Sequence, residues 1–506
     1  MPKGSVRKRI GLIAGVLIFV TVLLLPASAS MNVAAKRAAA CAILMAVWWI
    51  TEAIPIPATA LLPVVLYPLL KIMNAKEAVL PYADRNIFLF MGGFFIAMAM
   101  QRHDLHKRIA LHIIRIIGTS SRRLVLGFMI ATAFLSMWIS NTATTMMMLP
   151  IGLAVISHVK TQLENENAGI VSEAHNFRFA VTLMLGIAYA ASIGGVGTLV
   201  GTPPNIVFAG IVKNTLHGYG DIDFAKWMTI GLPVVIVFLP LAWLYLVYFG
   251  SPPEIKQIPG SKMLINNEIK SLGKMSRGES ITLIVFCLTA LGWLFRTNIN
   301  IGSFTIPGWS EILGIEKYVH DSTVAMAGAV LLFVIPTDFK RHEFVLNWEW
   351  AKRIPWGILI LFGGGFALAA SFQATGLDKW IGDRFAAINY VSILMLIVAV
   401  CLLLTFLTEI TSNTATITMM LPVLAAMALS LKIHPFILMI PATISTSFAF
   451  MLPVATPPNA IVFGSEYIEM HRMAKIGFVL NLMGVIIITS LMYLVVFPML
   501  AIRLSF

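Results

Sequence analysis

The chain has 506 residues, of which 58% are hydrophobic and only 12% are charged, and its mean hydropathy is +0.88. This composition excludes a water-soluble domain, because so few polar residues could not cover its surface. The net charge of +13 would suggest a nucleic-acid partner in a soluble protein, but in a membrane protein it belongs to loops that face the cytoplasm.

Apolar stretches long enough to cross a bilayer recur along the chain, which predicts an all-α polytopic membrane protein. The first stretch, 10–26, lies between basic residues and "PASAS", as a cleaved signal peptide would. Because many spans follow it, we expect it to remain as the first helix. The other predicted spans are 34–52, 55–70, 86–101, 178–212, 226–249, 279–295, 321–336, 355–375, 436–464 and 475–502, which makes eleven transmembrane helices.

Two further apolar stretches, near 124–157 and 391–430, carry almost the same polar cluster at their centres. "SNTATTMMMLP" begins at Ser140 and "SNTATITMMLP" begins at Ser412, and the two agree at nine of eleven positions. Each stretch could form one long span or a re-entrant hairpin whose tip is the cluster.

The positive charges in the loops favour two re-entrant hairpins. With both hairpins present and a cytoplasmic N-terminus, the long basic loops at 102–123 and 251–278 both lie on the cytoplasmic side. If only the first stretch were a span, the loop at 251–278 would face outward. We therefore predict hairpin tips at 140–142 and 412–414.

The order of the spans makes the two clusters part of an inverted repeat. Five crossings separate the clusters, so the second copy is upside down relative to the first. Other segments repeat with them: "LFMGGFFIA" at 89–97 returns as "LFGGGFALA" at 361–369, and "GTPPNIVF" at 201–208 returns as "ATPPNAIVF" at 455–463. Inverted-topology repeats are typical of secondary carriers, with the substrate site at the midplane where the repeats meet.

The repeat predicts four parts of the chain. They are N-terminal helices at 1–85, a first inverted repeat at 86–250 with a broken helix at 201–205, a connecting loop and helices at 251–354, and a second repeat at 355–506 with a broken helix at 455–459.

The repeated segments suit a site for ions. Ser and Thr supply hydroxyls, Asn supplies both N–H donors and a carbonyl oxygen, and S-N-T is a good helix start. Two successive prolines break a helix and free backbone carbonyls that can bind a cation. Neither cluster has a Lys or Arg beside it, so bound cations would have to offset the charge of a dianion. Ser and Thr also join helices in ordinary membrane proteins, but two mirrored clusters, each with a T-P-P-N break, favour a site.

Acidic and histidine side chains leave other interpretations open. Glu52 and Glu409 lie near or within apolar segments, and Glu409 could be a proton site or a carboxylate that caps backbone N–H groups. His103, His106 and His112 follow a basic loop and are expected to be solvated at the membrane surface.

The paired clusters, together with "GIAYAASIGGVGTLVGTPPN" and "PVATPPNAIVFG", resemble the divalent-anion:sodium symporter family of dicarboxylate and citrate carriers. The resemblance covers essentially the whole chain, beginning at "WWITEAIPIPATALLP". It implies a homodimer with a fixed scaffold domain, which includes residues 1–85, and a mobile transport domain that moves like an elevator.

The resemblance also implies the ligands. One Na⁺ would be held by Ser136, Ser140, Asn141 and the backbone near Gly201, and a second by Thr408, Ser412, Asn413 and the backbone near Ala455. The substrate would meet Ser140, Asn141 and Thr142 from one tip and Ser412, Asn413 and Thr414 from the other, with Thr202, Pro203, Thr456 and Pro457 completing the wall.

The leading hypothesis is therefore a carrier, not an enzyme, that couples Na⁺ to the import of C4 dicarboxylates such as succinate, malate and fumarate, or of related di- and tricarboxylates. We expect a multi-pass protein of the plasma (cell inner) membrane with a cytoplasmic N-terminus and no nucleic-acid partner. The alternatives are a Na⁺-independent dicarboxylate exchanger, a proton-coupled oxyanion carrier that uses Glu409, and a channel.

Overall fold

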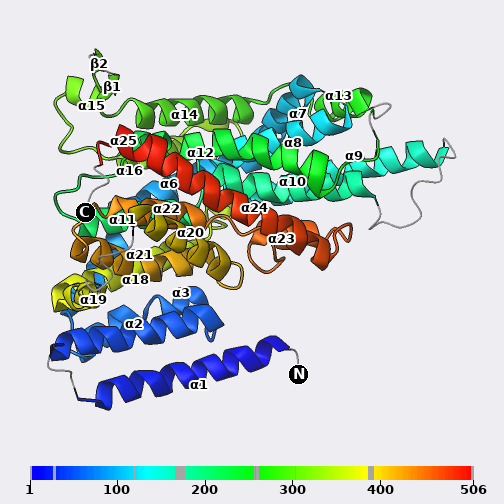
Figure 1. The fold of residues 1–506 in the computed structure, drawn as a ribbon. Helices are drawn as coiled ribbons and strands as arrows, with labels where there is room; N and C mark the ends of the chain where they lie inside the picture. Colours follow the sequence, from blue (N-terminus) through cyan, green and yellow to red (C-terminus); the bar gives the residue numbers. More distant parts are fainter. Residues whose placement is uncertain are drawn as a thin grey trace.

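The computed structural model describes residues 3–26, 30–118, 120–165, 177–255, 257, 261–301, 304–385 and 392–502. These residues are mostly helical, and their strands form two short antiparallel hairpins in connecting segments (Figure 1). One hairpin pairs β1 (Ile299–Ile301) with β2 (Phe304–Ile306), and the other pairs β3 (Pro336–Asp338) with β4 (Glu343–Phe344). The predicted all-α class is confirmed.

Thirteen α-helices, one 3₁₀ helix and one π-helical turn lie in the described residues up to Ser271. They are α1 (Lys3–Leu24), α2 (Val33–Thr51), α3 (Ile56–Thr59), α4 (Leu62–Leu69), α5 (Ala75–Val79), the 3₁₀ helix η1 (Leu80–Ala83), α6 (Arg85–Arg102), α7 (Leu105–Ile117), α8 (Ser121–Ser136), α9 (Asn141–Asn165), α10 (Arg178–Gly195), α11 (Pro203–Thr215), α12 (Phe224–Tyr245), the π-helical turn η3 (Leu246–Gly250) and α13 (Ser261–Ser271).

The remaining described helices follow Ser271. They are α14 (Arg277–Leu294), α15 (Trp309–Ile312), α16 (Asp321–Val334), α17 (Trp348–Ala351), α18 (Trp356–Thr375), α19 (Leu377–Phe385), α20 (Ile393–Thr408), α21 (Asn413–Ser430), α22 (Phe436–Ser445), α23 (Pro457–Phe463), α24 (Met470–Leu491), the π-helical turn η5 (Met492–Val496) and α25 (Phe497–Met499).

In the described part of the chain, nine helices are long and apolar enough to cross a membrane. Four shorter apolar helical stretches accompany them, at Ile56–Leu69, Asp321–Val334, Ile393–Thr408 and Phe436–Ser445. Helices lie in each of the eleven predicted spans, but 178–212 and 436–464 each hold two helices separated by a non-helical segment. The chain is thus a multi-pass membrane protein, while the number of crossings stays a prediction.

Both SNT clusters lie at the turn of a helix–turn–helix. In the first, α8 ends at Ser136 and α9 begins at Asn141; in the second, α20 ends at Thr408 and α21 begins at Asn413. The arms α8 and α20 each have 16 residues. At 1.5 Å per residue such an arm is about 24 Å long, short of the ~30 Å hydrocarbon core. The other arms, α9 with 25 residues and α21 with 18, belong to the helices long enough to cross, so the re-entrant hairpins stay a prediction.

Two helix pairs are interrupted close to the predicted breaks at 201–205 and 455–459, but the interruptions come earlier in the chain, and residues 203–205 and 457–459 are helical. The first is α10 with α11, interrupted at 196–202, and the second is α22 with α23, interrupted at 446–456. The repeats pack in a mirrored way, because α9 contacts α23 of the other repeat and α11 contacts α21. Each hairpin therefore packs against the T-P-P-N half-helix of the opposite repeat, which brings the two sets of motifs into one region.

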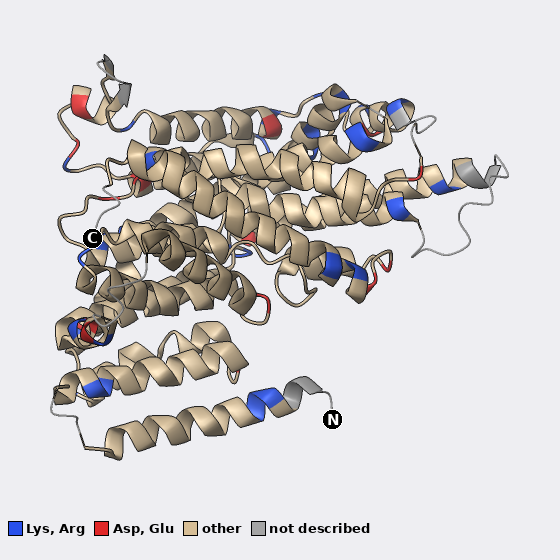
Figure 2. Cartoon of the chain, viewed as in Figure 1, with Lys and Arg blue, Asp and Glu red and all other residues tan. Residues whose placement is uncertain are grey.

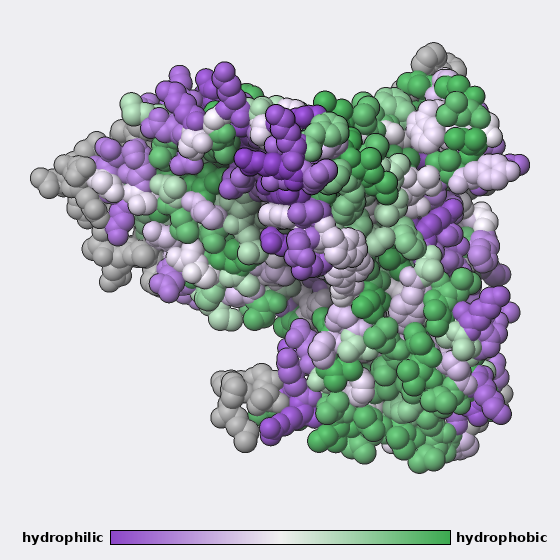
Figure 3. All heavy atoms as spheres, turned by 180° about the vertical axis from the view of Figure 1, so that it is seen from behind, coloured by the Kyte–Doolittle hydropathy of each residue, from purple (hydrophilic) through white to green (hydrophobic). Residues whose placement is uncertain are grey.

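Charge and hydropathy follow the helix axes. Lys and Arg gather toward the helix ends, and many lie at the end of the molecule that carries α7, α13 and the beginning of α24 (Figure 2). Figure 3 shows a broad hydrophobic surface in the lower part of the molecule with hydrophilic residues at its two edges. This is the pattern expected when helix sides meet lipid and helix ends meet water.

Candidate ion and substrate site

The first hairpin turn brings together several of the oxygen atoms predicted to hold Na⁺. Ser136 is fully buried at the end of α8, and its Oγ lies 2.6 Å from Asn141 Oδ1 and 2.7 Å from Ala191 O on α10. A hydroxyl has one proton and can donate to only one of these oxygens at a time. If Ser136 donates to Ala191 O, its lone pairs and Asn141 Oδ1 are left to bind a cation.

The broken segment after α10 closes on this turn so tightly that only glycine fits. A Cβ atom at Gly195 would lie 2.5 Å from Asn141 Oδ1, and one at Gly201 would lie 2.4 Å from Gly195 O and 3.0 Å from Ser136 O. Ser136, Asn141 and the backbone at Gly201 therefore lie together, as the proposed ligand set requires.

The second hairpin repeats the arrangement with threonine in place of serine. Thr408 is fully buried, and its Oγ1 lies 2.6 Å from Asn413 Oδ1 and 3.3 Å from Thr446 O. Ala191 lies in α10, and Thr446 directly follows α22. The buried hydroxyls of Ser136 and Thr408 therefore each contact a carbonyl of the first helix, or of its end, in their own repeat's broken pair. A hydroxyl–amide pair that recurs at the same place in both repeats favours a binding site over a role in helix–helix packing alone.

The rest of each cluster lies at the beginning of a half-helix. Ser140 Oγ accepts the Ala143 N–H at 3.3 Å, as predicted for a helix cap, whereas the Ser412 side chain makes no such bond. Ser140, Asn141, Thr142, Ser412, Asn413 and Thr414 are all half-buried, in contrast to the buried anchors behind them. The helices α9 and α21 thus begin at the clusters, and the partial positive charge of a helix N-terminus favours negative charge there.

The T-P-P-N segments supply the other two helix beginnings. Thr202 and Thr456 are the residues before α11 and α23 and are 3% and 5% exposed, and Pro203 and Pro457 are the first helical residues. Ala455, the predicted backbone ligand, lies directly before Thr456 and is 6% exposed.

Sequence reasoning missed the asparagine that ends each T-P-P-N. Asn205 is fully buried, and its Nδ2 donates to Thr198 O at 2.7 Å and Gly195 O at 3.1 Å. Asn459 is also fully buried, and its Nδ2 donates to Ala449 O at 2.9 Å and Leu452 O at 3.1 Å. Each amide joins the second helix of its pair to carbonyls at or within the interruption that precedes it, so each holds the backbone of the broken segment in place. The signal was available in the sequence, because the asparagine repeats in both copies.

Glu409 caps the backbone of the second broken helix, and the first repeat has no acid at the matching position. It is 3% exposed; its Oε1 accepts Met451 N at 3.0 Å and Asn481 Nδ2 at 2.7 Å, and its Oε2 accepts Leu452 N at 3.0 Å. Asn481 Oδ1 accepts the preceding N–H, that of Phe450, at 3.2 Å. The broken helix leaves three successive N–H groups without helical partners, and these two side chains satisfy them. The structure thus favours the capping role over the proton site.

The histidines depart from the expectation of a solvated surface. His112 is exposed, but His106 is buried and its Nδ1 lies 2.9 Å from Met100 O, while His103 Nε2 lies 2.8 Å from Val345 O. The packing of α7 explains the burial of His106, because α7 is amphipathic and turns this side chain inward, whereas His103 lies at the end of α6.

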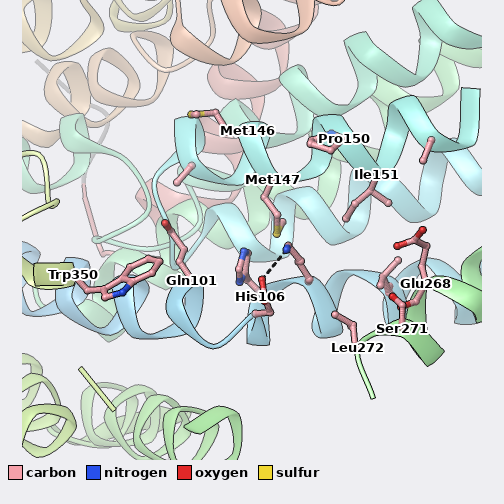
Figure 4. A pocket seen from close by; sticks show the side chains of 15 residues that line it. Gln101, His106, Met146, Met147, Pro150, Ile151, Glu268, Ser271, Leu272 and Trp350 are labelled. Carbon is pink, nitrogen blue, oxygen red and sulfur yellow. Dashed lines mark hydrogen bonds and ion pairs between the residues drawn. The ribbon is translucent and has the colours of Figure 1, made fainter. Parts of the chain in front are cut away.

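A cavity of about 640 Å³ lies beside the first hairpin. Its walls come from the end of α6, from α7, from α9 and from α13, and Met147 points from α9 toward the His106 side (Figure 4). Ala143, two residues after Asn141, lines one side of the cavity, and Glu268 and Ser271 of α13 line the other.

Comparison with known proteins identifies the family. Residues 7–501 match the model of the sodium:sulfate symporter transmembrane region. A sodium-dependent dicarboxylate transporter of Staphylococcus saprophyticus is 44% identical, with 99% of this chain and 94% of that protein covered, and the Staphylococcus aureus counterpart is 43% identical, with 97% and 92% covered.

Solved structures show a similar fold at low identity. MtrF of Neisseria gonorrhoeae, described as an antimetabolite efflux pump, has a TM-score of 0.53 at 12% identity, with 85% of this chain and 84% of that chain covered. The YdaH transporter of Alcanivorax borkumensis has a TM-score of 0.52 at 15% identity, with 89% and 97% covered. The family match over nearly the whole chain confirms the resemblance drawn from the motifs: this chain belongs to the sodium:sulfate, or divalent-anion:sodium, symporter family of membrane carriers.

Proposed function

We propose that this protein couples the inward movement of Na⁺ to the import of C4 dicarboxylates such as succinate, malate and fumarate. The observation that carries the proposal is the mirrored pair of buried oxygen clusters, Ser136 with Asn141 and Thr408 with Asn413. The relatives' name, sodium-dependent dicarboxylate transporter, supports both the ion and the substrate class.

The site has the polarity that such a complex needs. Hydroxyl, amide and carbonyl oxygens are hard ligands suited to small cations, and the N–H groups at the helix beginnings suit carboxylates. Two Na⁺ ions neutralise a dianion, so the substrate is held without a fixed positive side chain in the membrane. The predicted ligands for Na⁺ are Ser136, Ser140, Asn141, Gly201, Thr408, Ser412, Asn413 and Ala455, and for the substrate Ser140, Asn141, Thr142, Thr202, Pro203, Ser412, Asn413, Thr414, Thr456 and Pro457.

The transport cycle belongs to the same proposal. The two hairpins and broken helices would move together across the membrane as an elevator against a scaffold that includes residues 1–85, in a homodimer of the plasma membrane with a cytoplasmic N-terminus. The cavity beside Ala143 would then connect the first hairpin with the cytoplasm, because it opens toward α7 and the basic α13.

Uptake by purified protein in liposomes tests the function. We expect saturable accumulation of labelled succinate that follows an inward Na⁺ gradient and disappears when choline replaces Na⁺. A panel of malate, fumarate, citrate and sulfate as competitors identifies the substrate class. Equal succinate counterflow with and without Na⁺ would reject symport in favour of exchange, and uptake driven by a proton gradient alone would favour the proton-coupled alternative.

The asparagines that hold the broken segments should affect Na⁺ more than substrate. We expect Asn205→Asp and Asn459→Asp each to raise the Na⁺ concentration for half-maximal uptake about tenfold, because an aspartate oxygen repels the carbonyls that the amide now ties together. The apparent affinity for succinate at saturating Na⁺ should change much less. The matched control is Asn267→Asp on the exposed side of α13. A general loss of uptake with an unchanged Na⁺ dependence would mean that the two amides only support the fold.

A further inference from the structure

A second cavity, of about 440 Å³, lies outside the candidate transport site, between the end of α12 and the beginning of α24. These two helices pack against each other, and the cavity lies where α12 passes into the π-helical turn η3. Tyr245, Phe249 and Gly250 form one wall, and Arg472 and Lys475 lie on the other. A π-helical turn widens the backbone locally and often marks a functional position.

The cavity is basic. Arg472 is held in place by a 3.0 Å hydrogen bond from its Nη2 to Ser251 Oγ. Lys475 lies one turn further along α24 and is exposed, with no ion pair to any described residue. The acid in the wall, Glu469, already lies 3.2 Å from His471 Nδ1. Glu254 and Arg178 also act on the charge of Arg472, and Glu254 accepts the N–H groups of Arg178 and Phe179 at 2.6 and 2.9 Å. Lys475 adds a positive charge that no carboxylate of the described residues pairs with, which favours an anionic ligand.

The surroundings of the cavity are those of the lipid–water boundary. Phe249 is 78% exposed beside it, and Phe478, one turn beyond Lys475, is 44% exposed. The guanidinium carbon of Arg122 lies over the neighbouring Tyr248 ring, 4.3 Å from the centroid of that ring. Aromatic rings next to cations at the end of membrane helices are typical of the headgroup region.

We propose that this cavity binds the phosphate of an anionic phospholipid, with Arg472 and Lys475 on the phosphate and the acyl chains along the exposed faces of α12 and α24. A lipid is favoured over a soluble anion because it also covers Phe249 and Phe478, which a free phosphate would leave in contact with water. Basic pockets between membrane helices on the cytoplasmic side recognise such headgroups. The proposal does not depend on which substrate the protein carries.

Native mass spectrometry of the full chain in detergent tests the proposal, with phosphatidylglycerol and phosphatidylcholine added in turn. We expect phosphatidylglycerol to remain bound preferentially, and Arg472→Gln/Lys475→Gln to weaken its binding roughly tenfold or more, as the loss of two cations near the headgroup predicts. Lys475→Gln alone should give an intermediate loss without disturbing Ser251. The matched control is Lys270→Gln/Lys274→Gln, which removes two exposed lysines of the α13 region.

Three results would overturn the lipid assignment. Equal retention of phosphatidylglycerol by the double variant would mean that these cations do not bind it. Competition by inorganic phosphate or glycerol 3-phosphate at the same concentration as the lipid would make this a soluble-anion site. Efficient disulfide crosslinking between two chains through Phe249→Cys would mean that a second copy covers this face.

Discussion

Uptake of succinate by Asn141→Ala is expected to fall about 100-fold at a Na⁺ concentration that half-saturates the unaltered protein. The substitution removes the amide oxygen that lies 2.6 Å from Ser136 Oγ and also the side-chain N–H groups available to a carboxylate. Two interactions with charged groups at roughly 1.5 kcal/mol each give a loss of this size. Initial rates in liposomes over a range of Na⁺ concentrations measure it.

Asn413→Ala should have an effect of similar size, because Thr408 and Asn413 repeat the same geometry in the other half. The double variant should be little worse than either single variant, since both halves are needed to complete one site. Asn267→Ala, on the exposed face of α13, serves as the control for the loss of an asparagine. If either single variant kept its normal Na⁺ dependence and rate, the corresponding half would have no part in ion binding.

Glu409→Gln is expected to lower the thermal stability of the protein and to weaken uptake at every pH. Its carboxylate accepts the N–H groups of Met451 and Leu452, and an amide would set an NH₂ group against one of them. One unsatisfied buried donor costs about 1–3 kcal/mol, and the repulsion adds to this. Thermal unfolding in detergent and uptake at several pH values measure the two effects.

The same variant separates the capping role of Glu409 from proton coupling. Loss of stability with a residual uptake whose pH profile keeps its shape is the expected result. Normal stability with the loss only of proton-driven uptake would instead make Glu409 the proton site. Glu52→Gln is the matched control, because Glu52 is an exposed acid at the end of α2.

The family resemblance implied Ser136, Asn141, Thr408 and Asn413 as ligands, and the structure places them in two hydroxyl–amide pairs. Their role in binding Na⁺ stays a prediction. Such pairs are predictable because the anchor and the amide are five residues apart, on either side of one turn. The role of the glycines could not be predicted in the same way. Gly195 contacts Asn141, which lies far from it in the sequence, and no local sequence pattern reports such a contact.

The task of Glu409 could not be derived from the sequence. Its partners Met451, Leu452 and Asn481 come from distant segments, and the first repeat has Met137 at the matching position, so the internal repeat gives no second copy to compare. The histidines show the same limit: a basic, amphipathic segment predicted solvent contact, and the packing of α7 buried His106 instead.

The sequence by itself determined that this is a helical membrane protein with two repeated polar clusters, and it predicted their inverted arrangement, because hydropathy, charge in the loops and repeated motifs are local properties of the chain. The tertiary structure decided which side chains satisfy the opened backbone of the broken helices, and it placed Arg472 and Lys475 in one cavity with Phe249. Those features depend on contacts between helices far apart in the chain. A backbone N–H group that is not bonded within its own helix acquires a hydrogen-bond acceptor only when the helices pack together.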